Sequence, residues 1–554
     1  MDHSPTPEYC KLLDALRSHF PSPAPDPEGD ARFGAAIALA LDGVAALKSA
    51  SPLLGAPGKP VSMAAAGLQL ADAPQSIEAT IAQLASRLAG MHQSGHAASQ
   101  LNVTPPPSTA SIVGVLLAAI ANPNLCSDES GRGLLDAENE AAAMTARLVG
   151  YDPELAGGCF TFGGAGTTLY GIKVGLEKAQ PGSMRAGLRP GAAVLASQAC
   201  HYSALNAAAW LGIGEKNVLL APCNDDGSVR IEALAAAAKG AITEGRRIAA
   251  IVATLGSTDA FALDDLAAVH ALRERLVQEH SLDYQPHLHA DAVAGWAWAA
   301  FNDYDFEQNE LGFSTRTRRA LAAARERIRH LPLADSLGVD FHKTGFAPYV
   351  SSLVLFRDRR DLDLIRRSPA TTPYLYQSAG NHPGLFTLET SRSAAGPMAA
   401  LAGLLALGKG GLRSLIGHAV EMAGVLRSAL AEHPEFAVVN DRNVGSVTLF
   451  RVYPPGADAK ALFGRELTES ADERQALVVN ELNRRVCERL RIEALAGRGV
   501  LLSMTECGRT TAGGAPLAAL KSYVLSPFCN QDAMFAIGPA VLAARDAAMA
   551  DQPP

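Results

Sequence analysis

The chain is poor in charge, in aromatic side chains and in paired cysteines. Of its 554 residues, 19% are charged and 6% are aromatic, and the formal net charge is −8. No long run of Lys or Arg occurs, which argues against nucleic acid or an anionic membrane surface as a partner. The eight cysteines include no Cys-x-x-Cys pair, which disfavours a disulfide framework and a zinc site. We therefore expect a small-molecule substrate, no metal site and a reducing, cytoplasmic environment.

The chain also lacks recognisable targeting and membrane-spanning segments. Residues 1–5 form neither a basic n-region nor an apolar h-region, and the alanine-rich run from Ser111 to Ala121 is too short to cross a bilayer. These absences predict a soluble protein with no membrane partner.

The hydrophobic pattern predicts three regions. Residues 1–120 have a helical pattern and form an N-terminal arm and layer, interrupted by a proline-rich linker at 21–27. In residues 121–392, short apolar runs alternate with amphipathic helices, which predicts an α/β fold with a mostly parallel sheet. Residues 393–554 predict a smaller α+β domain, with a helix at 393–407 and strands at 447–452 and 522–525. The Arg-rich segment 303–330 is interpreted as an insertion with a solvated helix, and its role stays open.

Apolar runs mark the expected strands of the large domain. One helix between them, Asp265 to His280, has Asp264 as its expected N-cap. Ligands of such sheets bind at the carboxyl ends of the strands, so the residues after each run are the candidates for chemistry. The runs are 160–162, 193–195, 218–220, 248–255, 287–290 and 353–356.

A glycine-rich turn follows the first of these runs and opens a helix. Glycines let backbone N–H groups approach an anion, and the helix N-terminus and two threonine hydroxyls complete a phosphate cradle. A turn of this kind also occurs for packing reasons alone. The cradle residues are Gly163, Gly164, Ala165, Gly166, Thr167 and Thr168.

Two further polar residues follow expected strands. His201 comes after the run at 193–195, where its imidazole can stack on a flat ring or serve as a structural histidine. Asp291 ends the run at 287–290, where a buried carboxylate needs a partner such as a protonated ring nitrogen. A helix cap or an ion pair with a nearby arginine is the alternative for Asp291.

Lys343 lies between a strand-like approach and a turn that contains Gly345 and Pro348. Burial lowers the pKa of a lysine and makes its amine available as a nucleophile or Schiff-base partner. A surface lysine at the end of a strand is the alternative. A phosphate cradle, a stacking ring, a carboxylate and a lysine, in this chain order, are the parts that hold pyridoxal phosphate.

From about residue 100 to 412 the sequence resembles the fold-type I enzymes of pyridoxal phosphate, specifically the group II amino-acid decarboxylases. This group includes glutamate, aromatic amino-acid and tyrosine decarboxylases. The resemblance rests on four motifs: Thr161 to Gly164, Ser197 to Ser203, His289 to Ala292 and Asp340 to Lys343. The chain departs from the family pattern at Thr344, which follows the lysine, and at Thr168, where Asn is usual.

The resemblance implies a role for each motif residue. Lys343 would bind the cofactor as a Schiff base, Asp291 would hold the pyridine nitrogen protonated, and His201 would stack on the ring. Binding near the cofactor is also implied for His342, Thr254 and Ser257. Substrate and proton-transfer roles fall to Arg392 for the substrate carboxylate, to His96 and Asn102 for a side-chain pocket, and to Tyr376, with Tyr374 as the alternative, for protonation of Cα.

The implied function is decarboxylation of an L-amino acid to an amine and CO2 through an external aldimine. The family also implies a homodimer with the active site at the subunit interface. Two alternatives stay open. The run Pro348 to Ser352 resembles sphingosine-phosphate lyases, which keeps a carbon–carbon aldehyde lyase in view. The third is a non-catalytic homologue that binds the cofactor without turnover.

Overall fold

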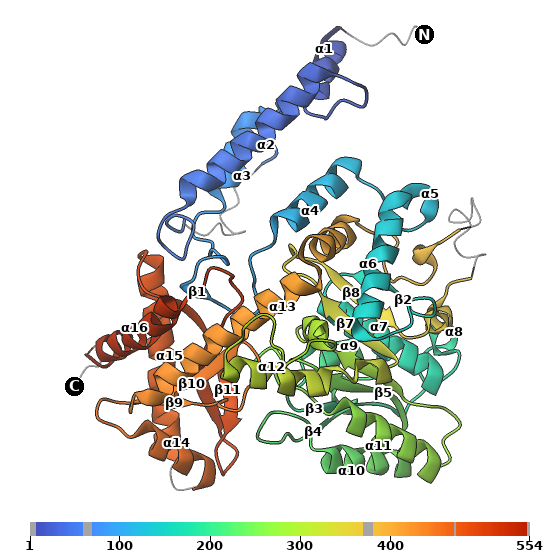
Figure 1. Cartoon of the computed structure of the whole chain (residues 1–554). Helices are drawn as coiled ribbons and strands as arrows, with labels where there is room; N and C mark the ends of the chain where they lie inside the picture. The colour runs from blue at the N-terminus through green and yellow to red at the C-terminus, as the bar shows by residue number, and fades with distance from the viewer. Residues whose placement is uncertain (1–6, 59–68, 369–379, 470–472, 551–554) are drawn as a thin grey trace. The chain divides into compact units, whose positions relative to one another are not determined.

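The computed structural model describes residues 7–58, 69–368, 380–469 and 473–550 (Figure 1). The chain separates into two compact units, one with residues 1–99 and 490–501 and one with residues 100–489 and 502–554. The division at residues 120 and 392 remains a prediction. Tyr374 and Tyr376 lie outside the described residues.

The first unit is helical, as its sequence predicts. Ser76 caps the third helix by accepting a hydrogen bond from the Ala79 N–H at 3.2 Å. The second helix begins at Pro27, a residue suited to the first helical turn, and it packs against the third helix. The three helices are α1 (Pro7–Arg17), α2 (Pro27–Leu47) and α3 (Ile77–Ser86).

The second unit is built on a seven-stranded sheet with the order β2-β8-β7-β6-β5-β3-β4. Only β8 runs antiparallel to its neighbours, and the other strands share one direction. The prediction of a mostly parallel α/β sheet is therefore confirmed, and each of the six apolar runs coincides with a strand. The strands are β2 (Gly157–Thr161), β3 (Ala192–Ser197), β4 (Val218–Ala221), β5 (Arg247–Thr254), β6 (His287–Asp291), β7 (Ser336–Asp340) and β8 (Ser352–Phe356).

Both faces of this sheet are buried. On β3, Leu195 packs in a core with α10 (Ile231–Thr243) and α11 (Leu266–Glu279), while its neighbour Val194 packs in another core with α7 (Gly164–Ala179). On β5, Ile251 packs in the same core as Leu195, and Val252 packs in the same core as Val194. Because neither face meets water, the strands appear in the sequence as continuous apolar runs.

Thirteen helices follow α3 among the described residues. The helix predicted at 265–280 is α11, but its N-cap is Asp265, whose side chain accepts from the Ala268 N–H at 3.1 Å. The prediction of Asp264 as the cap is wrong, because Asp264 accepts instead from the backbone N–H groups of Val229 and Thr254, each at 2.7 Å. The helices are α4 (Thr109–Ala121), α5 (Asp128–Gly131), α6 (Gly133–Val149), α7 (Gly164–Ala179), α8 (Ser183–Ala186), α9 (Ser203–Trp210), α10 (Ile231–Thr243), α11 (Leu266–Glu279), α12 (Thr315–Ile328), α13 (Ala395–Glu432), α14 (Ala459–Thr468), α15 (Glu473–Leu495) and α16 (Gln531–Ala550).

The C-terminal region carries a second, antiparallel sheet. Its strands pair in the order β11-β12-β10-β9. The strand expected at 447–452 is β10, and the one expected at 522–525 is the end of a longer strand, β12. The strands are β9 (Phe436–Val438), β10 (Val447–Val452), β11 (Leu501–Thr510) and β12 (Pro516–Tyr523), and a two-residue strand, β1 (Ser99–Gln100), precedes them in the chain.

Within the part of the chain that the structure describes, two helices, α13 and α16, are long and apolar enough to cross a membrane by length and composition alone. Within the second unit, α13 packs against α4, α6, α12 and α16. A core helix of this kind passes the same test, so the result is weak evidence for a membrane span. Helix α13 continues past the predicted end at residue 407 and kinks at Gly408, whose φ is +57°.

Candidate active site

The candidate residues follow strands that run in the same direction and therefore end at the same edge of the large sheet. Gly163 comes two residues after β2, His201 four residues after β3, and Lys343 three residues after β7. Asp291 is the last residue of β6, where it pairs with Thr254 of β5 and Gly338 of β7. Carboxyl ends of parallel strands are where α/β sheets bind ligands.

The glycine turn joins β2 to α7 and leaves no room for a side chain at Gly164. Gly163 has a φ of +130°, which favours glycine, and a Cβ on Gly164 would lie 2.8 Å from Asp340 Oδ2. The first N–H groups of a helix have no acceptor within the helix, so this end of α7 suits an anion.

The hydroxyls of the two threonines in the turn make contacts within the protein, although we expected them to complete a phosphate cradle. The Thr167 hydroxyl donates to the Gly164 carbonyl at 2.7 Å, and the Thr168 hydroxyl lies 3.5 Å from both that carbonyl and Ser203 Oγ. Both side chains are fully buried, whereas Ala165 is exposed. The hydroxyls are thus engaged in hydrogen bonds within the protein. The Gly166 N–H donates to the Gly163 carbonyl at 2.8 Å, so the anion donors offered here are the backbone N–H groups of Gly164 and Ala165.

Lys343 is held in a buried ion pair. Its Nζ lies 2.9 Å from Asp340 Oδ2, and its side chain is 15% exposed. Burial lowers the pKa of Lys343, but the Asp340 carboxylate, with a smaller contribution from Asp291, more than offsets this and leaves the pKa above its ordinary value. The expectation of a lowered pKa is therefore wrong in this structure, because sequence inspection did not pair the lysine with Asp340.

Asp340 is a residue that sequence analysis used only as part of a motif. It is 1% exposed, and its Oδ1 accepts a hydrogen bond from Ser352 Oγ at 2.6 Å. Its Oδ2 lies 3.5 Å from His342 Nε2 as well as 2.9 Å from the Lys343 amine. This carboxylate thus connects the lysine, the histidine and the glycine turn.

The residues after Lys343 fold back over His342. The His342 ring is buried, its Nδ1 lies 3.2 Å from the Ser351 N–H, and burial lowers its pKa. The Tyr349 ring lies on it with the centroids 4.1 Å apart, and the Tyr349 hydroxyl donates to the Val103 carbonyl at 3.2 Å. Tyr349 was not among the predicted site residues. The signal that marks it is its position in the turn after the lysine.

Thr344, the departure next to Lys343, is buried in the core. Its hydroxyl donates to the Ala294 carbonyl at 3.0 Å. The substitution is thus accommodated by packing and a backbone hydrogen bond.

Asp291 is buried with an unsatisfied oxygen. Its Oδ1 has no hydrogen-bond partner among the residues that the structure describes. Burial raises the pKa of Asp291 to about 6, the Lys343 amine lowers it and Asp340 raises it. A carboxylate in this state calls for a cationic or N–H partner at its open oxygen.

His201 and the loop after β5 complete the predicted group. His201 Nδ1 accepts from the Ser203 N–H at 3.2 Å, and burial together with the Lys343 charge lowers its pKa, which favours a neutral imidazole. The Thr254 hydroxyl is buried with no partner among the described residues. Ser257 Oγ, in contrast, accepts from the N–H groups of Ala260 and Ala262 and so holds its own loop.

Arg392 is engaged in a buried ion pair, although we expected it to meet a substrate carboxylate. Its guanidinium bonds both carboxylate oxygens of Glu138, with Nη1 to Oε2 at 3.0 Å, and also donates to the Leu125 carbonyl at 2.8 Å. Arg392 borders a cavity of about 330 Å³ with Phe162 and Val350, yet its charge is already neutralised by Glu138. The substrate role of Arg392 stays a prediction, and this arrangement gives it a structural role first.

The two residues expected to line a side-chain pocket belong to different units, so that pocket stays a prediction. His96 belongs to the first unit, where its Nδ1 accepts from the Ala98 N–H at 3.1 Å. Asn102 belongs to the second unit, where its Oδ1 accepts from Ser503 Oγ at 3.2 Å. Tyr376 lies outside the described residues, so its role as proton donor also stays a prediction.

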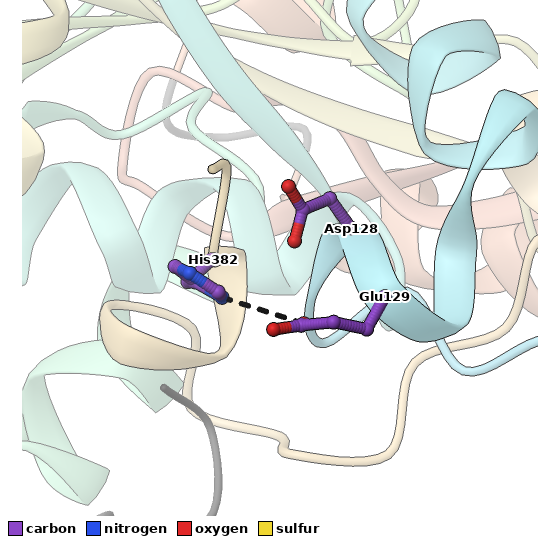
Figure 2. A group of neighbouring side chains, drawn as sticks. All are labelled: Asp128, Glu129 and His382. Atoms are coloured by element: carbon purple, nitrogen blue, oxygen red, sulfur yellow. Dashed lines mark ion pairs between the residues drawn. The ribbon is translucent and has the colours of Figure 1, made fainter. Parts of the chain in front are cut away.

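One group of side chains has the composition of a metal site. Asp128 and Glu129 on α5 and His382, which precedes the 3₁₀ helix Pro383–Leu385, point toward one another with ligand atoms within 4.8 Å (Figure 2). His382 Nδ1 lies 3.9 Å from Glu129 Oε2, so an ion pair accounts for part of the group. The expectation of no metal site is not tested by this arrangement.

The group at the sheet edge fits pyridoxal phosphate. The helix N-terminus at Gly164 offers N–H groups to a phosphate, and the open Asp291 Oδ1 offers an acceptor to a protonated ring nitrogen. Lys343, the lysine beside both, offers the amine for covalent attachment. The three features come from three different strand ends, which is the arrangement that a flat, phosphate-bearing ring needs.

Solved structures with the same fold include two decarboxylases. The glutamate decarboxylase domain of a Vibrio parahaemolyticus protein matches with a TM-score of 0.74 and 18% identity over 97% of this chain and 99% of that one. Catharanthus roseus tryptophan decarboxylase matches with a TM-score of 0.71 and 16% identity over 95% and 100%. At these identities the likeness shows the fold, and it confirms the predicted fold-type I architecture.

Relatives in sequence match over part of the chain. A glutamate decarboxylase-like protein of Gibberella zeae is 29% identical over 262 residues, which are 47% of this chain and 45% of that one. L-2,4-Diaminobutyrate decarboxylase of Rhizobium meliloti is 29% identical over 270 residues, 48% and 47%. The chain thus spans about half the length of the curated relatives it matches. The model of the pyridoxal-dependent decarboxylase conserved domain matches residues 60–453. The chain therefore belongs to the family of pyridoxal-dependent decarboxylases, and its cofactor is pyridoxal phosphate.

Proposed function

We propose that this protein removes the carboxylate of an L-amino acid as CO2 and releases the corresponding amine. The observation that carries the proposal is the buried Asp291 Oδ1, which has no partner among the described residues and lies at the sheet edge that also carries Lys343. A carboxylate at this place holds a proton on the ring nitrogen of the cofactor. When bound, the cofactor supplies a ring that accepts the electron pair left by CO2.

The chain's own residues divide the remaining work. Lys343 would hold the cofactor covalently through its amine. His201, kept neutral by burial, covers the ring without adding a charge that would compete with the protonated nitrogen. Asp291 would be ionised beside that nitrogen, since a cation at its open oxygen lowers its pKa, which burial is the main cause of raising to about 6.

The test uses a panel of amino acids with the purified protein. Release of CO2 and one amine is expected from at least one member of the panel, and Lys343→Ala is expected to abolish it. Borohydride reduction followed by peptide mass spectrometry is expected to find the cofactor on Lys343. Aldehyde release without CO2 would replace the proposal with a carbon–carbon lyase. Bound cofactor with no turnover would replace it with a non-catalytic homologue.

The substrate is an amino acid whose side chain stays undefined. Relatives are named as decarboxylases of L-2,4-diaminobutyrate, L-tyrosine and aspartate, which differ in charge and size. The panel therefore has to include basic, aromatic and acidic amino acids.

We also propose that the active form is a homodimer. Three side chains beside the glycine turn and Lys343 are exposed and mostly apolar: Phe162 at 51%, Tyr349 at 59% and Val350 at 48%. Apolar surface of this kind at the mouth of a site suits a second copy of the chain. Phe162→Glu is expected to shift the protein from dimer to monomer in sedimentation velocity, and a monomeric wild type would refute the proposal.

A cytoplasmic location is proposed on the cysteine chemistry. The eight cysteines of the sequence include no Cys-x-x-Cys pair, which fits a reducing compartment. Cell fractionation with an antibody to the chain tests this, and recovery in an oxidising compartment would refute it.

A further inference from the structure

Asp340 has no assigned role in the proposed reaction. Its Oδ2 lies 2.9 Å from Lys343 Nζ and 3.5 Å from His342 Nε2, and a Cβ on Gly164 would lie 2.8 Å from the same oxygen. The carboxylate therefore stands against both the amine that binds the cofactor and the helix end that receives its phosphate. Its side chain is 1% exposed, so water screens none of these interactions well.

Two requirements conflict at this carboxylate. Lys343 is held as an ammonium by the Asp340 charge, yet an ammonium has no lone pair with which to attack a carbonyl carbon. A phosphate at the N-terminus of α7 would bring a second anion next to a buried carboxylate. When two anions share one buried place, one of them takes up a proton.

We propose that Asp340 accepts the proton of Lys343, and that phosphate bound at the Gly164 end of α7 drives this transfer. One proton moves from Lys343 Nζ to Asp340 Oδ2, which leaves a neutral amine and a neutral carboxylic acid. The amine nitrogen then forms its bond to the carbonyl carbon, and the carbonyl oxygen leaves as water with the two remaining amine protons. Asp340 is thus a positioning residue in the lysine ammonium form and a proton acceptor when the phosphate arrives.

The other titratable groups around Asp340 are poorer acceptors. Burial lowers the pKa values of His342 and His201, which disfavours the charged imidazolium of each. Burial raises the pKa of Tyr349, so this phenol keeps its own proton. Asp291 is the second carboxylate, and in the proposed function its charge pairs with the protonated ring nitrogen of the cofactor. Asp340 is also the carboxylate within direct ion-pair distance of Lys343.

The inference rests on pyridoxal phosphate as the cofactor but not on decarboxylation. It is tested on the apoprotein with inorganic phosphate, so its failure is distinguishable from failure of the proposed reaction. The readout is the rate of reductive methylation at Lys343, since only a neutral amine reacts, followed by peptide mass spectrometry between pH 6 and 10.

In the wild type, methylation of Lys343 is expected to be slow without phosphate. Phosphate at millimolar concentration is expected to speed it at least about tenfold at pH 8, since loss of a neighbouring opposite charge shifts a pKa by one to three units. Asp340→Asn is expected to be methylated fast without phosphate and to show no phosphate effect. Asp340→Glu keeps a carboxylate and is expected to keep the phosphate effect, which separates proton acceptance from simple packing.

The control is Asp361→Asn, which removes the partner of another lysine in the same unit. Asp361 Oδ2 lies 2.6 Å from Lys178 Nζ, so the variant is expected to speed methylation of Lys178 and to leave Lys343 unchanged. A wild-type Lys343 rate that does not respond to phosphate would overturn the proposal. An Asp340→Asn protein that is folded by circular dichroism and methylated at the wild-type rate would overturn it too.

Discussion

Replacing Asp291 by Asn measures what it costs to keep this carboxylate buried. Asp291 is 5% exposed, and burial raises its pKa to about 6 from an ordinary value of 3.8. A difference of about two units at 1.36 kcal/mol per unit corresponds to about 3 kcal/mol. Because the folded state binds this proton more tightly than the unfolded chain does, the group's contribution is fully present below pH 3.8. It is lost as the pH rises through about 6.

Asn has a similar shape and no charge, so the Asp291→Asn apoprotein avoids this cost. At pH 8 its free energy of unfolding is expected to exceed that of the wild-type apoprotein by about 3 kcal/mol, and near pH 4 the two are expected to agree. Urea unfolding followed by circular dichroism at pH 4, 6 and 8 measures the difference. Equal stabilities at pH 8, or a less stable variant, would show that Asp291 has a partner in the apoprotein and would remove the main support for its role.

Two further predictions concern polar contacts around the site. Glu138→Gln leaves the buried Arg392 without its counter-charge and is expected to cost about 3 to 5 kcal/mol of unfolding free energy. The double variant Glu138→Leu with Arg392→Met is expected to recover most of this loss. Urea unfolding of the wild type and the two variants measures the difference, and a Glu138→Gln protein as stable as the wild type would reopen the substrate role of Arg392. Tyr349→Phe removes the hydrogen bond to the Val103 carbonyl and is expected to cost about 1 kcal/mol without loss of the cofactor, and a cofactor-free Tyr349→Phe protein would mean that the phenol binds it.

The large sheet was predictable because its strands are buried on both faces. Leu195 and Val194 point to different cores, so neither could be polar, and the run is visible without knowledge of its neighbours. The order of the strands was not predictable in the same way. Nothing in the local pattern of β8 says that it inserts antiparallel between β2 and β7, because that depends on the path of the chain after Lys343.

The residues that form the site were predictable from the sequence, but their ion pairs were less so. A glycine turn, a histidine, an aspartate and a lysine after successive strands are local signals, and parallel strands bring them to one edge. The ion pairs are not local signals. Sequence spacing cannot tell that Glu138, 254 positions before Arg392, takes up both arms of its guanidinium. The prediction of a helix cap at Asp264 failed for a related reason, since its carboxylate accepts hydrogen bonds from the backbone N–H groups of Val229 and Thr254.

The charges of the site explain why cofactor binding has to be coupled to proton movement. Asp291 and Asp340 are both buried, Lys343 is the cation that faces them, and the two histidines are held neutral by burial. With both carboxylates ionised the group carries an excess of negative charge, and the Asp340 charge adds to burial, the main cause, in raising the pKa of Asp291. The cofactor adds a protonated nitrogen, whose charge pairs with the Asp291 carboxylate, and a phosphate, which makes the surroundings of Asp340 more negative. One proton on Asp340 relieves that excess and leaves Lys343 neutral at the time when its amine must react.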